Sequence, residues 1–112
     1  GIEGITISGG EPMMQAGRIA KVLEIVKLLR PELDVIVFSG FELKQLVWQD
    51  AEELLKYIDV LVAGVYIDRL NDGKGLRGSN NQTIHFLTDK LKDHKDYFYG
   101  RKRDLEFHIK FK

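Results

Sequence analysis

Short apolar runs alternate with stretches of helical spacing over the first half of this 112-residue chain. Three runs, at residues 5–8, 34–39 and 59–64, are nearly continuous and stop at a glycine, which is typical of strands covered on both faces of a parallel sheet. Residues 17–30 and 43–58 lie between them with helical spacing. This order predicts parallel pairing through right-handed crossovers. The expected fold class is therefore α/β, with a parallel sheet of at least three strands and helices on its outer face.

The two helical stretches are expected to differ. In the first, Pro31 ends the pattern, and we expect one face on the core, made of Ile19, Val22, Leu23, Val26 and Leu29. The second is expected in two pieces, because "DAEE" at residues 50–53 has the spacing of a capping box. The later piece is expected to carry three residues inward, namely Leu54, Leu55 and Ile58.

The second half of the chain is less regular. Residues 67–82 form a glycine-rich loop, residues 83–87 a short strand or turn, and residues 88–104 a charged helix or solvated segment. The end, "LEFHIKFK", alternates between apolar and polar positions, which predicts a half-buried strand, antiparallel or at an edge. We therefore expect a single domain: a βαβαβ core over 1–66, the loop over 67–82, and an extension over 83–112 that ends in a strand.

Composition narrows the class of partner. Seventeen basic and 17 acidic residues cancel, so the global charge favours neither nucleic acid nor an anionic membrane. There is no apolar run long enough to span a bilayer and no signal-peptide pattern at the start, which predicts a cytoplasmic location without membrane attachment. The chain contains no cysteine, so disulfides, thiolate catalysis and cysteine-ligated metals are excluded for these residues.

Candidate chemistry gathers where the predicted strands end. Ligands of open α/β sheets bind at the carboxyl ends of the strands. These ends read "SGGE" at residues 8–11, Ser39-Gly40 and Ala63-Gly64. Glycines let main-chain groups approach a ligand, and an adjacent carboxylate can receive an ammonium group. Tight strand-to-helix turns are the simpler explanation of a lone Gly-Gly pair.

Other motifs are weaker. Gly73, Gly75 and Gly78 match G-x-G-x-x-G, but they follow a loop and open no apolar helix, and Lys74 does not complete a phosphate-binding loop. Ser8 is not in a nucleophile elbow. Three histidines, His85, His94 and His108, share no metal-ligand spacing. The basic "GRKR" at 100–103 is interleaved with acids, so a solvated face is favoured over a nucleic-acid patch.

Four segments in order, "GITISGGEPMMQ", "VIVFSGF", "LLKYIDVLVAGVY" and "LRGSNNQ", resemble the radical S-adenosylmethionine superfamily. More closely, they resemble the activating enzymes of anaerobic ribonucleotide reductase. The resemblance covers about three quarters of the chain and implies a partial (β/α) barrel that holds a [4Fe-4S] cluster and S-adenosylmethionine. It implies that the whole protein generates a 5′-deoxyadenosyl radical that activates a glycyl radical enzyme, with an electron donor such as flavodoxin as a second partner.

The resemblance also implies roles for particular residues. Those expected to bind the cofactor are Ser8, Gly9, Gly10, Glu11, Ser39 and Gly64, with Gly9, Gly10 and Glu11 at the amino group of its methionine and Pro12 shaping the turn. A loop expected to contact the cofactor or the substrate protein consists of Arg77, Gly78, Ser79, Asn81 and Gln82.

Two departures from the family qualify this expectation. The family's C-x-x-x-C-x-x-C loop, which holds the cluster, is missing, and Ala63 stands where many relatives carry an acid. We therefore interpret the chain as a fragment without the first βα unit, with no catalytic or metal-ligating residue of its own and no activity alone. Loss of that unit predicts an open edge beside residues 5–8 and self-association through it. The alternative is a non-catalytic α/β module that binds a nucleotide-like ligand or a partner protein.

Overall fold

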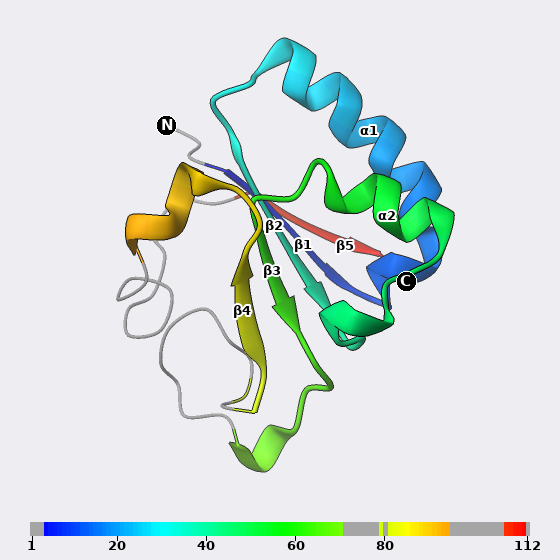
Figure 1. Cartoon of the computed structure of the whole chain (residues 1–112), viewed down its shortest axis with the longest axis vertical. Coiled ribbons are helices and arrows are strands. Elements are labelled where there is room, and N and C mark those ends of the chain that lie inside the picture. Colours follow the sequence, from blue (N-terminus) through cyan, green and yellow to red (C-terminus); the bar gives the residue numbers. More distant parts are fainter. Residues whose placement is uncertain (1–3, 71–78, 80, 95–106, 112) are drawn as a thin grey trace.

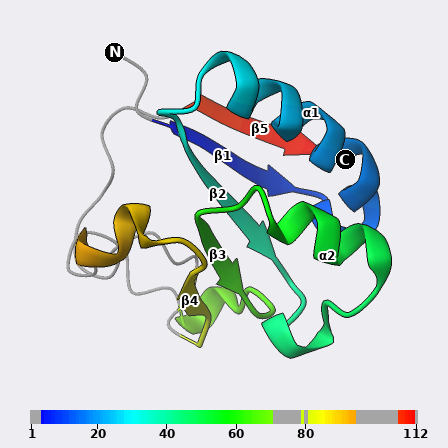
Figure 2. The ribbon, with the colours of Figure 1, turned by 45° about the horizontal axis from the view of Figure 1, so that its top comes forward.

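The computed structural model describes residues 4–70, 79, 81–94 and 107–111. The three predicted apolar runs are strands β1 (Gly4–Gly9), β2 (Asp34–Ser39) and β3 (Val60–Ala63), and two further strands are β4 (Thr83–Phe86) and β5 (Phe107–Phe111). They form a five-stranded sheet in the order β4-β3-β2-β1-β5 (Figures 1 and 2). The pairs β5–β1, β1–β2 and β2–β3 are parallel, and β4 runs antiparallel to β3.

The expected α/β class is confirmed, with a mostly parallel sheet. Residues 83–87, expected as a strand or turn, contain β4, whose Ile84 lies opposite Val62 of β3. Part of the expected charged segment is the 3-10 helix η4 (Asp89–His94). The strand order describes an open mixed sheet, so the partial barrel stays a prediction. The segments 71–78 and 95–106, with the glycine motif and "GRKR", lie outside the described residues.

The last strand bears on two expectations. It was expected to be antiparallel or at an edge, and β5 does lie at an edge of the sheet, where it runs parallel to β1 with Ile5 opposite Phe107 and Gly9 opposite Phe111. The same pairing occupies the side of β1 that was expected to be open. The expectation of an open β1 edge is therefore wrong, because the chain pairs that edge with its own β5 (Figure 2). Self-association stays a prediction.

Both α-helices pack on one face of the sheet (Figure 1). The 3-10 helix η1 (Pro12–Gln15) leads from the end of β1 into α1 (Ala16–Leu29), and the stretch after β2 folds in two pieces as predicted. These pieces are the 3-10 helix η2 (Leu43–Gln45) and the helix α2 (Gln49–Leu55). Leu54 and Ile58 are fully buried, and Leu55 is partly buried against the same core.

The buried face of α1 differs from the prediction. Ile19 and Leu23 are buried as expected, but Val22 is 52% exposed and Leu29 is 74% exposed. Two alanines that the prediction left out, Ala16 and Ala20, complete the buried face. The buried face of α1 therefore combines small and large side chains, and Val22 and Leu29 lie on its outer surface.

The predicted cap of α2 was also wrong. The residue that precedes this helix is Trp48, whose side chain makes no capping hydrogen bond, although Asp50 and Glu52 do supply acids in the first turn. A capping box is present one element earlier, at η2. There Glu42 and Gln45 cap each other reciprocally, and the backbone N–H of Glu42 donates to Gln45 Oε1 over 2.7 Å. The reciprocal spacing therefore occurs where the chain leaves β2, not where α2 begins.

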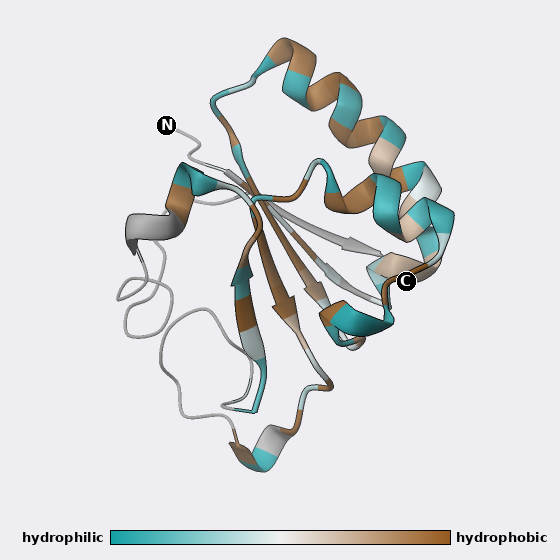
Figure 3. Ribbon diagram, in the orientation of Figure 1, coloured by the Kyte–Doolittle hydropathy of each residue, from teal (hydrophilic) through white to brown (hydrophobic). Residues whose placement is uncertain are grey.

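The sheet carries an apolar cluster on each face. The larger cluster joins alternate strand residues such as Ile7, Val37 and Leu61 to both α-helices. The smaller one, on the opposite face, consists of Ile36, Val60, Val62 and Ile84. Because both faces are apolar, β2 and β3 read as continuous runs, and they are brown along most of their length in Figure 3. Within the described part of the chain, no helix has the length and apolarity needed to cross a membrane.

Candidate functional site

The structure brings the predicted strand-end residues of β1 and β2 into contact at one edge of the sheet. Because β1, β2 and β3 are parallel, their carboxyl ends point the same way (Figure 1). Ser8 and Glu11 come from the end of β1, and Ser39 and Gly40 from the end of β2. This geometry confirms that the two strand ends meet, which is the placement that a shared ligand site requires.

Glu11 is the centre of this contact. Its Oε2 accepts hydrogen bonds from the Met13 N–H over 2.8 Å and from the Ser39 hydroxyl over 2.9 Å. Its Oε1 accepts from the Gly40 N–H over 2.6 Å. The carboxylate therefore links β1 to β2 with three neutral donors, and among the described residues it forms no ion pair. Within residues 4–70, 79, 81–94 and 107–111, no cation of the chain pairs with this negative charge.

A cavity of about 360 Å³ opens beside this carboxylate. It is lined by Ser8, Glu11, Pro12, Phe38, Ser39, Gly40, Tyr66 and Gln82. One part of the lining is charged and the rest is largely apolar, with two aromatic side chains. Such a cavity suits a ligand that carries both a cation and a flat apolar group. Gly9 and Gly10 adjoin the cavity in sequence but are not among its lining residues.

Gly64 lies at the end of β3 in a backbone conformation that favours glycine. Its φ of +112° is strained for any residue with a Cβ, whereas the nearest atom to an added Cβ would be 3.7 Å away. Its N–H donates to the carbonyls of Ser39 and Phe41 over 3.0 and 3.2 Å. The residue does not line the cavity, but it joins the end of β3 to the end of β2.

The segment after the glycine-rich loop fastens the chain that follows β3. The Asn81 side chain donates to the Val65 carbonyl and the Gln82 side chain donates to the Gly64 carbonyl, each over 2.9 Å. The Ser79 hydroxyl accepts from the Ile67 N–H over 3.1 Å, and Ser79 is fully buried. Two further residues of the predicted contact loop, Arg77 and Gly78, lie outside the described residues. Of the three described members, only Gln82 lines the cavity.

Sequence reasoning missed both aromatic residues of the cavity. Phe38 was read only as part of an apolar strand, and it is indeed partly packed against the smaller cluster. Tyr66 follows β3 in an irregular stretch, where no periodicity marks it. Its exposure of 47% is high for a large side chain next to a buried strand. That contrast is visible only once the end of β3 is defined.

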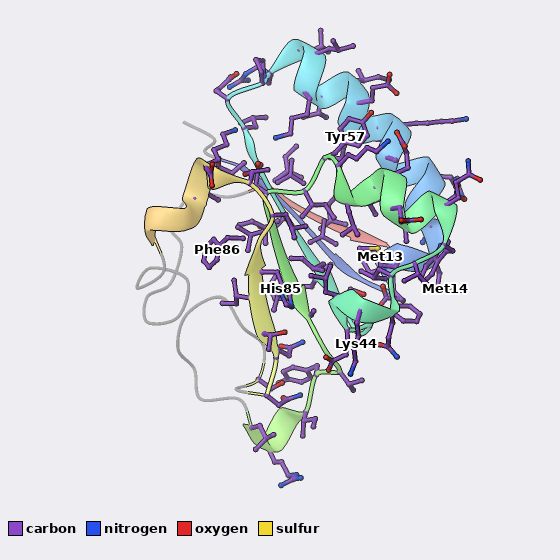
Figure 4. All side chains as sticks on the ribbon, viewed as in Figure 1. Met13, Met14, Lys44, Tyr57, His85 and Phe86 are labelled. Carbon is purple, nitrogen blue, oxygen red and sulfur yellow. The ribbon has the colours of Figure 1, made fainter. Side chains whose placement is uncertain are left out.

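A second, larger hollow lies away from the strand ends. An open groove of about 650 Å³ runs between α1 and α2, with Arg18 and Lys21 on one side and Asp50 and Glu53 on the other. At its inner end Met13 is 1% exposed, and the next residue, Met14, is 72% exposed (Figure 4). Its charges are of both signs and its members converge on no common point. The smaller cavity at the strand ends is therefore the candidate site.

The next feature is the surroundings of His85, as a candidate metal ligand. His85 lies on β4, where its Nε2 is 3.0 Å from the Thr83 hydroxyl (Figure 4). No group of three or more His, Cys, Asp or Glu residues that could hold a metal occurs in the ranges that the structure describes.

The opposite end of the sheet holds another carboxylate, Asp59, which precedes β3. It is 3% exposed, and its Oδ2 accepts from the Lys27 ammonium over 3.0 Å and from the Val35 N–H over 2.8 Å. Its Oδ1 accepts from the Thr88 hydroxyl over 2.8 Å. This carboxylate is fully engaged, with a cation of the chain itself among its partners.

Comparison with known proteins assigns the family. A family model described as "4Fe-4S single cluster domain" matches residues 1–85. The chain belongs to this family. Three relatives are each named anaerobic ribonucleoside-triphosphate reductase-activating protein. They confirm the resemblance to activating enzymes that the four ordered segments predicted. No solved structure gives a significant match.

The relatives come from a phage and two bacteria. The protein of Enterobacteria phage T4 is 36% identical over 98 residues, which cover 83% of this chain and 59% of the relative. The Vibrio cholerae protein is 40% identical over 90 residues, covering 76% and 56%. The Haemophilus influenzae protein is 36% identical over 86 residues, covering 74% and 55%. The chain therefore spans little more than half the length of the curated relatives it matches.

The residues of this chain do not fit the cluster that the family description names. A [4Fe-4S] cluster is held by cysteine thiolates, and the 112 residues contain none. The donors at the strand ends are a carboxylate, two hydroxyls and main-chain groups, which suit an organic cation better than iron. What the site can do chemically is bind and orient such a cation.

Proposed function

We propose that this chain forms the S-adenosylmethionine-binding part of an activating protein for an anaerobic ribonucleoside-triphosphate reductase. The observation that carries the proposal is the Glu11 carboxylate, which three neutral donors hold beside the cavity. The names of the three relatives support the choice of an anaerobic ribonucleoside-triphosphate reductase as the enzyme that is activated. A sulfonium ligand with an amino acid at one end and adenosine at the other has both features that the lining matches.

Each residue of the site has its own role in binding the ligand. Glu11 receives the ammonium of the ligand's methionine, since a carboxylate that already accepts three hydrogen bonds still has lone-pair capacity for one more donor. Gly9 and Gly10 allow close approach of the main chain, and Ser8 forms part of the wall. Ser39 holds the carboxylate in position, and Gly64 ties β3 to β2.

The partners belong to the same proposal. A reductase that carries a glycyl radical is the protein acted upon, and an electron donor such as flavodoxin serves the whole activating protein. Because these 112 residues hold no thiolate, the cluster's ligands must come from outside them. We also include in the proposal that the sheet is a segment of a partial (β/α) barrel, a fold that places its ligands at the carboxyl ends of its strands.

A second candidate function is a non-catalytic module that binds a nucleotide-like ligand or a partner protein. One observation favours it, namely the absence of cysteine from the 112 residues. The two candidates differ in the ligand's charge. A site built around Glu11 prefers the cationic S-adenosylmethionine to ATP, whereas a general nucleotide site has no reason to do so.

The test measures binding of S-adenosylmethionine and ATP to the 112-residue chain by isothermal titration calorimetry. We expect S-adenosylmethionine to bind, and Glu11→Gln to weaken it about tenfold or more, because a charge-assisted hydrogen bond contributes about 1.5–3 kcal/mol. The matched control is Glu24→Gln, an exposed carboxylate on α1. Equal loss in both variants, or equal affinity for ATP, would overturn the proposal.

A further inference from the structure

A short irregular segment, residues 64–67, contributes Tyr66 to the lining of the cavity, and its backbone is anchored on both sides of this residue. The Gly64 carbonyl accepts from Gln82, the Val65 carbonyl accepts from Asn81, and the Ile67 N–H donates to Ser79. Three side chains of one distant segment therefore bind the residues before and after Tyr66. Irregular backbone held this closely is pre-organised, and its position does not have to be found when a ligand binds.

The anchoring segment is itself rigidly built. Ser79 is fully buried, and its N–H donates to the Gln82 side chain over 3.0 Å. The Gln82 N–H donates in turn to the Ser79 carbonyl over 3.1 Å. Gln82 is 6% exposed, and both the oxygen and the nitrogen of its side-chain amide form hydrogen bonds inside the protein. The side chains of this segment thus act on the wall of the cavity, and Gln82 also borders the cavity.

Tyr66 is the residue whose backbone position this anchoring fixes. It lines the cavity together with Phe38, yet it is 47% exposed although it lies three residues after a fully buried strand. A large aromatic side chain left accessible on a fixed backbone is typical of a surface that stacks on a flat ligand. Glu11 lines the same cavity and supplies the charge. The lining therefore combines an aromatic ring with a carboxylate.

We infer that Tyr66 is the stacking surface for the adenine ring of the ligand, and that Asn81 and Gln82 are positioning residues that act through it. This inference rests on the proposed function and deepens it by assigning the adenosine half of the ligand. Glu11 recognises the amino-acid half, and Tyr66 recognises the base. Asn81 and Gln82 then serve specificity without contacting the reacting part of the ligand.

Three probes separate the two halves in binding measurements on the full 112-residue chain. S-adenosylmethionine carries both halves, 5′-methylthioadenosine carries the adenosine half, and S-methylmethionine carries the sulfonium amino-acid half. We expect Tyr66→Ala to weaken the binding of S-adenosylmethionine and of 5′-methylthioadenosine about tenfold, which is the usual loss on removing one stacking ring. The binding of S-methylmethionine should not change. Tyr66→Phe keeps the ring and is expected to bind within about twofold of the natural chain.

The positioning role has its own readout. Asn81→Ala is expected to weaken the binding of 5′-methylthioadenosine by less than Tyr66→Ala does. In the double variant, Asn81→Ala is expected to add almost nothing to the loss caused by Tyr66→Ala, because both changes act on the same ring. Val47→Ala is the matched control, since Val47 is 72% exposed, does not line the cavity and lies outside the anchored segment. Independent losses that simply add in the double variant would refute the positioning role of Asn81.

The possible failures are distinguishable. If the natural chain binds none of the three probes, the proposed function fails and this inference fails with it. If S-adenosylmethionine binds and depends on Glu11, but Tyr66→Ala leaves 5′-methylthioadenosine binding unchanged, only the assignment of Tyr66 is wrong. Circular dichroism of each variant shows whether it folds, and Tyr66→Phe tests the ring without removing it.

Discussion

Glu11 and Asp59 are two carboxylates at opposite ends of the same sheet, and their surroundings differ. Asp59 is 3% exposed and accepts from the Lys27 ammonium, a main-chain N–H and a hydroxyl. Glu11 also accepts three hydrogen bonds, but all from neutral donors, and it borders a cavity. Among the described residues, the first charge has a cation of the chain beside it and the second has none. The same chemical group is structural at one end, and at the other it is the group that we propose binds a ligand.

The largest expected effect is on stability at the Asp59 end. Asp59→Asn removes the partner of a mostly buried ammonium and sets an amide against the Lys27 or Val35 donor, so we expect a loss of about 3 kcal/mol in the free energy of unfolding. Urea denaturation followed by circular dichroism measures it. Glu11→Gln keeps the shape of its side chain beside neutral donors and is expected to cost about 1 kcal/mol. Equal losses would break the comparison, because Glu11 would then be as structural as Asp59.

Gly64 sharpens the comparison at the ligand end. Gly64→Ala introduces a Cβ at φ +112°, where space is available but the backbone is strained, so we expect about 1–2 kcal/mol of destabilisation. Gly40→Ala is the counterpart, because its added Cβ would lie 3.3 Å from Glu11 Oε1. We expect it to weaken S-adenosylmethionine binding more than it changes the denaturation midpoint. A purely structural role for Gly40 predicts the reverse.

The smallest expected effect concerns an exposed carboxylate that belongs to neither end. The hydrogen bond from Arg30 lowers the pKa of Glu32, and the backbone adds to this effect. A lowered pKa means that the pair's contribution to stability is present above the ordinary pKa of a glutamate and is lost as the pH falls through the lowered value. Comparing Glu32→Gln with the natural chain in urea titrations from neutral to acidic pH measures it. The difference should be small and should vanish at high salt, because the pair is solvated.

Most of the fold could be predicted from local patterns. The continuous apolar runs identified β1, β2 and β3 because both faces of the sheet are covered. The buried face of α1 could not be found from the large apolar residues alone, because Ala16 and Ala20 bring that helix against the sheet. The direction of β5 was out of reach as well. Alternation shows which residues share a face, but pairing Phe107 with Ile5 depends on the path of the whole chain.

The candidate site was predictable to a similar depth. Parallel strands bring their carboxyl ends together, so Ser8, Glu11 and Ser39 could be grouped from the sequence. Phe38 and Tyr66 could not, because one looks like an ordinary core residue and the other lies in an irregular stretch. The anchoring of residues 64–67 by Asn81 and Gln82 was invisible too, since it joins side chains to main-chain groups far away in the sequence.

The pairing of β1 with β5 links completion of the sheet to the order of synthesis. Ile5 emerges from the ribosome long before Phe107, its partner in the ladder. During that interval β5 is not yet available to the outer main-chain groups of β1. Long-range pairing of this kind is also slow to form. The β1 edge of the sheet should therefore be the last part of the ladder to close, and its need for protection should fall once β5 is in place.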